Sequence, residues 1–154
     1  MTAIELGESL RASRRALLAA ASGVTLERAV LRPSDGEWSV LEVLAHLVDV
    51  DYHWTSQALA MRDNPAHMFV GFDDAAWKQE HTDIRRTPLA DVLALLAGSH
   101  EAALYHLASM SADDLDAPGR HPRGIFYTVR DVFLRYPAHD EAHTRQIEEI
   151  LAAI

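Results

Sequence analysis

Four segments of the chain repeat apolar residues at the spacing of an α-helix, and this pattern limits the fold more than any other feature. No segment alternates apolar and polar residues with a period of two, so nothing in the sequence predicts a β-sheet. Polar loops marked by Pro and Gly separate the four segments, which span roughly residues 2–21, 39–62, 88–108 and 128–154. Helices of this length and number predict an all-α protein, a four-helix bundle with two longer connections at 63–87 and 109–127.

Capping residues indicate where two of these helices begin. Ser39 and Glu42 have the spacing of a capping box, in which side chain and backbone satisfy each other's free N–H groups. Thr128 and Asp131 form a second pair with this spacing. Pro137 interrupts the last segment, because proline removes a helix hydrogen bond. That helix therefore either kinks at Pro137 or is divided into two parts.

Length and composition predict one domain that spans residues 1–154. The chain has 154 residues, 49% of them hydrophobic, which is enough for a full core. No apolar run approaches the roughly 20 residues of a membrane-spanning helix, and the first residues do not resemble a signal peptide. We therefore expect a cytoplasmic protein without membrane contact.

Charge and cysteine content exclude several classes of function. The formal net charge is −9, and an acidic surface repels phosphate backbones, so we expect no nucleic-acid partner. The chain has no cysteine, which rules out disulfides, thiolate ligands and a cysteine nucleophile. Any metal ion must therefore bind through His, Asp or Glu.

Two histidines of the last segment are the strongest indication of chemistry. His139 and His143 are four residues apart on the apolar stripe between Tyr136 and Ile147. On a helix their Cβ atoms lie about 5–6 Å apart, so both imidazoles can reach one ion. With nine histidines in the chain, such a pair can also arise by chance. Burial favours the metal, since a shared cation satisfies two ring nitrogens at once.

His46 is the best third ligand in the remaining sequence. It lies on the second segment at the border of the apolar stripe, and facing helices of a bundle can bring side chains to one core site. The alternative is a histidine at the edge of the surface. His53 lies two turns further along the same face, about 10 Å away, and is too distant to share the ion.

No other motif suggests a catalytic group. Neither a nucleophile-elbow, a phosphate-binding loop nor a dinucleotide-binding motif is present, and no general base can be identified. A set of three histidines suits zinc, nickel, copper or iron, of which we favour zinc or nickel. It leaves at least one coordination position for water or a thiol.

Three stretches resemble the DinB/YfiT-like family of small metal-binding helical bundles. "GEWSVLEVLAHLVDVD" is similar to the family's W-S-x-x-E-x-x-x-H-L segment, and "FVGFDDAAW" to its F-D-x-x-x-W loop. "GRHPRGIFYTVRDVFLRYPAHDEAHTRQIEEI" is similar to its last helix, which carries H-x-x-x-H-x-x-Q-I. The resemblance covers nearly the whole chain, and the order and spacing of the three motifs are its most specific part.

The resemblance implies a four-helix bundle with a three-histidine site for a divalent metal ion, with His46, His139 and His143 at the matching positions. Family members of known activity include thiol-dependent transferases and isomerases that use bacillithiol or mycothiol. We therefore predict a metal-dependent enzyme, a thiol-dependent S-transferase or a hydrolase, acting on a small molecule. The alternative is a non-enzymatic, metal-stabilised binding or stress-response module. The resemblance and an apolar-rich first helix also predict a homodimer.

Overall fold

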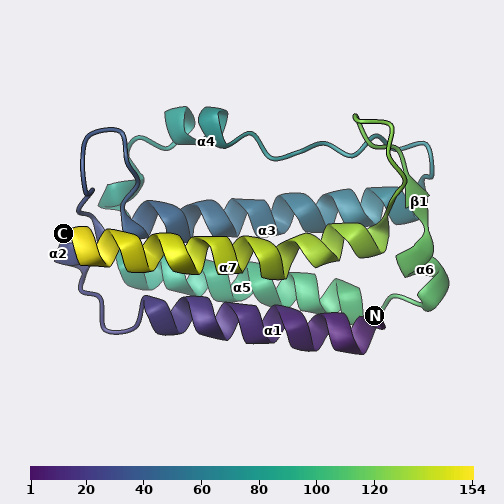
Figure 1. Cartoon of the computed structure of the whole chain (residues 1–154), viewed down its shortest axis with the longest axis horizontal. Helices are drawn as coiled ribbons and strands as arrows, with labels where there is room; N and C mark the ends of the chain where they lie inside the picture. The colour runs from purple at the N-terminus through teal and green to yellow at the C-terminus, as the bar shows by residue number, and fades with distance from the viewer.

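Four long helices form the bundle in the computed structural model, which describes all residues from 1 to 154 (Figure 1). The predicted capping boxes at Ser39 and Thr128 are both present, and a third one begins the first helix at Thr2. The predicted fold class is therefore confirmed. The long helices are α1 (Ala3–Ala20), α3 (Val40–Asp63), α5 (Leu89–Ala108) and α7 (Val129–Ala153).

The long connection between α3 and α5 sets the topology. It runs back along the whole length of the bundle, so α3 and α5 point in the same direction (Figure 1). Helices α1 and α7 are parallel to each other and antiparallel to this pair. In cross-section, α7 lies between α1 and α3, and α5 lies between the same two helices on the opposite side. The crossover places its short helix α4 (Asp74–Glu80) over α3 (Figure 1).

Short elements occupy the connections that the sequence predicts as loops. No strand is predicted, but β1 and β2 form a two-residue antiparallel ladder that closes the loop before α7. Such a short ladder carries no period-two pattern that could reveal it. The short elements are α2 (Leu26–Ala29), α4 (Asp74–Glu80), η1 (Ile84–Arg86), α6 (Ala112–Asp116), β1 (Pro118–Gly119) and β2 (Tyr127–Thr128).

Helix α7 continues through Pro137 without a break. The alternative of a helix in two parts is therefore wrong. A proline within a helix removes one backbone hydrogen bond and strains the helix, and here the residues on both sides of it are packed against the core. Tyr136 and Ile147 are both buried on the core side of α7 and provide that packing.

A buried polar layer divides the core into two apolar clusters. One cluster contains Leu10 and Trp54, and the other contains Leu17 and Leu47. Between them, the polar layer takes one residue from each long helix: Arg14 (α1), Asp51 (α3), Ser99 (α5) and Asp140 (α7).

Arg14 is the centre of the polar layer. It donates two hydrogen bonds to Asp51, both of 3.0 Å, and two to Asp140, of 2.9 and 3.1 Å. Ser99 donates to Asp51 at 2.7 Å. Burial opposes the charge of Arg14, but the two carboxylates raise its pKa above the ordinary value. The layer lies at the level of the histidines of α3 and α7, and it links all four helices there.

No helix of the bundle combines the length and apolar character that a bilayer crossing requires.

Candidate metal centre

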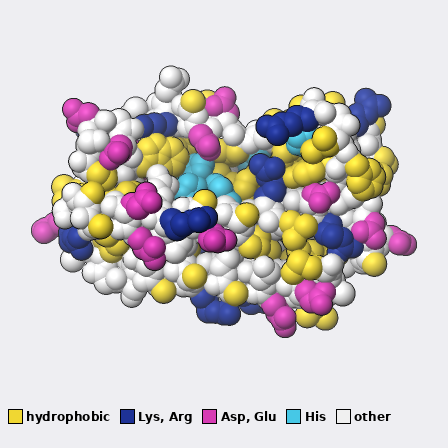
Figure 2. Space-filling model, viewed as in Figure 1, with side chains coloured by type: hydrophobic (Ala, Val, Ile, Leu, Met, Phe, Trp, Pro, Cys, Tyr) yellow, Lys and Arg dark blue, Asp and Glu magenta, His cyan; other side chains and the backbone are white.

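His46, His139 and His143 come together on the face between α3 and α7. One ring nitrogen from each lies within 4.8 Å of the others. Nε2 of His139 and Nε2 of His143 are 2.9 Å apart, and the ring centre of His46 is 5.5 Å and 5.2 Å from theirs. His46 is buried and the other two are half-buried. Histidine side chains are accordingly visible on the surface between α4 and α7 (Figure 2).

Aromatic rings enclose His46 on three sides. Trp38 precedes the first residue of α3, whereas Phe72 and Trp77 come from the crossover and α4. Their ring centres lie 4.8, 5.2 and 5.4 Å from that of His46. Trp54 packs in the same way on His139, at 4.8 Å. These contacts hold the imidazoles in place and exclude water from their outer faces.

Burial keeps the three imidazoles neutral. It lowers the pKa of His46 to about 3 and that of His139 to about 2, and the neighbouring histidines reinforce both shifts. Burial also lowers the pKa of His143, while a hydrogen bond to Gln146 opposes the shift. Neutral imidazole is the form that binds metal ions, because its unprotonated nitrogen carries a lone pair.

The donor set fits a divalent cation. Nδ1 of His143 lies 2.7 Å from Oε1 of Gln146. When Nδ1 donates this hydrogen bond, Nε2 keeps its lone pair and faces Nε2 of His139. Nδ1 of His46 is buried without a hydrogen-bond partner. Three nitrogen ligands of this kind could hold zinc or another borderline metal ion and leave a position open.

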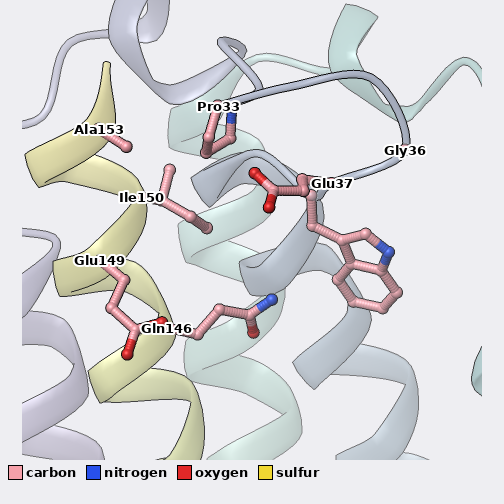
Figure 3. A pocket seen from close by; sticks show the side chains of 8 residues that line it. Pro33, Gly36, Glu37, Gln146, Glu149, Ile150 and Ala153 are labelled. Atoms are coloured by element: carbon pink, nitrogen blue, oxygen red, sulfur yellow. The ribbon is translucent and has the colours of Figure 1, made fainter.

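A pocket of about 480 Å³ lies beside the site, and two of its lining residues contact the histidines: Trp38 packs on His46, and Gln146 lies 2.7 Å from His143. Gln146 extends from α7 into this pocket, opposite the loop that carries Glu37 (Figure 3). Its amide therefore touches both the histidine set and the pocket. Through this contact, Gln146 also helps to orient the ring of His143.

Asp74 is a site residue that sequence reasoning missed. It begins α4, and its Oδ1 lies 3.6 Å from Nε2 of His46 while most of its side chain is exposed. Burial raises the pKa of Asp74 above its ordinary value, although His143 opposes the shift. No spacing in the sequence relates Asp74 to His46, because the contact depends on where the crossover packs.

Asp49 contacts the histidine set indirectly, through Trp77. It accepts a hydrogen bond of 2.6 Å from the indole of Trp77, which packs against His46. His53 lies outside the three-histidine group and bonds to the backbone oxygen of Val70 at 2.7 Å. His100 is buried on α5 and also lies outside the group.

The protein is thus a helical bundle, and three histidines from two facing helices form its candidate metal centre. Residues 9–147 match the sequence profile of the DinB superfamily, which is most of the chain. The protein therefore belongs to the DinB superfamily. No curated protein matches the chain in sequence.

Two solved structures share the fold. YfiT from Bacillus subtilis, described as a probable metal-dependent hydrolase with an unusual four-helix bundle topology, has a TM-score of 0.81 and 21% identity over 96% of this chain and 85% of its own. A mycothiol-dependent maleylpyruvate isomerase has a TM-score of 0.77 and 11% identity over 96% of this chain. This chain spans 61% of that isomerase. At these identities the likeness concerns the fold.

Proposed function

We propose that the protein is a divalent-metal-dependent enzyme in which His46, His139 and His143 hold the ion. The observation that carries the proposal is the convergence of three neutral imidazole nitrogens within 4.8 Å on an open face. YfiT, which is described as a probable metal-dependent hydrolase, and the mycothiol-dependent isomerase share this fold and lend support. We expect zinc or nickel as the ion.

The nucleophile comes from outside the chain. With no cysteine in the sequence, the protein has no thiol of its own. Once bound, a divalent ion lowers the pKa of a coordinated water or thiol, so that a nucleophile is available at neutral pH. If the nucleophile is a low-molecular-weight thiol, the enzyme is an S-transferase, and if it is water, the enzyme is a hydrolase.

Asp74 and the aromatic residues also contribute to the proposed reaction. The Asp74 carboxylate faces the open side of the histidine set and can accept the proton that the nucleophile releases. Trp38 and Trp77 shield His46 from water and keep its ring in one orientation. Gln146 orients His143 and borders the pocket where a small substrate can enter.

The alternative is a metal site that only stabilises a binding module. Such sites are normally closed by four protein ligands. Here the group contains three histidines, two of them half-buried, and the nearest carboxylate is largely exposed. This open arrangement favours the enzyme.

A titration of cobalt-substituted protein with thiols tests the proposal. We expect a sulfur-to-metal charge-transfer band with at least one of bacillithiol, mycothiol, glutathione and cysteine, and no band in His46→Ala. Asp74→Asn should retain one ion per chain, because the carboxylate is assigned to proton transfer. If no thiol produces a band while cobalt is bound, thiol activation is rejected and a hydrolase is the better assignment. If wild-type protein binds no metal, the enzyme proposal fails.

A further inference from the structure

A second pocket lies on the same face as the histidines. It has a volume of about 350 Å³ and lies between α7, the crossover before α4 and the loop that joins β1 to β2. Arg123 and His121 line it from the loop, Tyr127 from β2 and Arg135 from α7. In Figure 2, dark-blue Lys and Arg side chains lie on this face to the right of the central cyan histidines.

The two arginines of this pocket have no carboxylate partner. None of the ion pairs in the structure includes Arg123 or Arg135. The one side-chain partner of Arg135 is the hydroxyl of Tyr127, at 3.4 Å. Asp131 is the nearby acidic residue on α7, and its carboxylate accepts hydrogen bonds from Thr128 at the helix cap. In a chain with net charge −9, this pocket therefore presents two positive charges that no carboxylate of the chain neutralises.

Aromatic rings hold the Arg135 side chain in position. The central carbon of its guanidinium lies 5.0 Å from the ring centre of Trp54 and 5.3 Å from that of Phe69. A guanidinium that packs against aromatic rings keeps its N–H donors free at the edge. This planar fork matches the oxygens of a carboxylate or a phosphate.

The pocket is close to the histidine set. Arg135 and His139 are one turn apart on α7, a spacing that places their Cβ atoms about 5–6 Å from each other. Trp54 lies between them, and its ring centre is 4.8 Å from that of His139. The pocket and the histidine set therefore adjoin each other along α7, with Trp54 in contact with both.

We infer that this pocket is the anion-binding end of the substrate site, where Arg135 and Arg123 hold a carboxylate or phosphate group of the molecule that reacts at the histidines. This inference names a substrate class and so rests on the proposed function. Tyr127 and His121 complete the wall of the pocket, and the backbone N–H of Arg123 donates to Nδ1 of His121 at 3.2 Å. That bond closes a turn within the loop.

Calorimetric titrations of chelator-treated protein test the inference without the metal. Succinate serves as the carboxylate probe and inorganic phosphate as the phosphate probe. We expect saturable binding of one probe molecule per chain, weakened at least about tenfold in Arg135→Gln and in Arg123→Gln, because each removes a charge-assisted hydrogen-bond donor. Arg145→Gln is the matched control, since Arg145 lies exposed on the same helix and pairs with Glu141.

The two probes distinguish the substrate classes. Stronger binding of succinate supports a carboxylate substrate, and stronger binding of phosphate supports a phosphorylated one. Arg123 is exposed in a loop, so its variant keeps the test valid if Arg135→Gln loses stability. The inference is overturned if neither probe binds, or if Arg145→Gln weakens binding as much as the pocket variants. Because no metal is present, these outcomes are independent of the metal titration above.

Discussion

Burial determines the charge of the individual histidines and therefore what each can bind. The pKa values of His46 and His139 fall to about 3 and about 2, so both are neutral at physiological pH without help from a metal ion. The exposed carboxylate of Asp74 adds a negative charge on the open side. At the scale of the residue, the site is prepared for a cation.

Replacement of any one of His46, His139 and His143 by alanine should lower the metal content below one ion per chain. It should also remove the rise in thermal midpoint that metal causes in the wild type, since a bound ion stabilises only the folded state. Elemental analysis and thermal unfolding with and without chelator measure both effects. His53→Ala is the control and should change neither, because His53 bonds to the backbone of Val70 instead. Full metal content in a His139→Ala/His143→Ala double variant would falsify the site.

His100 should make the protein less stable as the pH falls from about 6.5 to about 4. Burial lowers its pKa to about 4, and Arg14 and Arg11 oppose protonation further. The unfolded chain, with a pKa near 6.5, therefore binds more protons than the folded one in this interval. The stability that the neutral imidazole contributes is complete above pH 6.5 and is lost toward pH 4, by about 3 kcal/mol at most.

Urea unfolding of metal-free wild type and His100→Gln at several pH values measures this effect. The difference in unfolding free energy between the two proteins should change across the interval, while the other histidines contribute equally to both. A constant difference from pH 4 to pH 7 would show that His100 does not titrate as its burial predicts.

At the scale of the helices, the polar layer determines how α1 joins the rest of the bundle. Arg14 is the one basic group between Asp51 and Asp140, which come from α3 and α7. A buried ion pair adds little net stability over an apolar core, but the loss of one partner leaves a buried charge without compensation. The layer therefore favours one arrangement of the helices over others.

Arg14→Met should destabilise the protein by about 3–5 kcal/mol, because two buried carboxylates lose their shared cation. Arg15→Ala on the exposed side of the same helix is the control and should stay within about 0.5 kcal/mol of the wild type. Denaturant unfolding at neutral pH compares the two. Equal stability of both variants would mean that another group compensates the two carboxylates. Arg14 would then not be needed to hold the polar layer together.

At the scale of the whole molecule, the crossover between α3 and α5 makes the site. It brings Phe72, Asp74 and Trp77 over His46, whereas a short turn would have left this face of the bundle open. The same arrangement keeps the N-terminus and the C-terminus at opposite ends of the bundle (Figure 1).

We expect the protein to form a homodimer in solution. The prediction comes from the family resemblance and the apolar first helix, where Ile4 and Leu18 are exposed. Tyr105 on the neighbouring helix α5 is 74% exposed, and burial of such side chains against a second copy would be favourable. Light scattering from about 1 to 100 μM checks the assembly. A monomer at every concentration would remove this prediction and leave the metal site unaffected.

The sequence by itself determined the features that depend on neighbours along one helix. Apolar spacing predicted the four long helices, and capping pairs predicted the starts of α3 and α7. His139 and His143 were predicted to be close because residues four apart share a helix face. His46 could be proposed only from its position on an apolar stripe, and the family motif supplied the same residue.

Only the tertiary structure decided which parts of different helices meet. Arg14 and Asp140 are 126 positions apart, and no local pattern relates one buried charge to another over that distance. Asp74 beside His46, and Arg135 beside the loop of Arg123, likewise follow from how the connections pack on the bundle. Local periodicity determines which face of a helix is buried, but the choice of partner depends on the packing of all four helices and their long connections together.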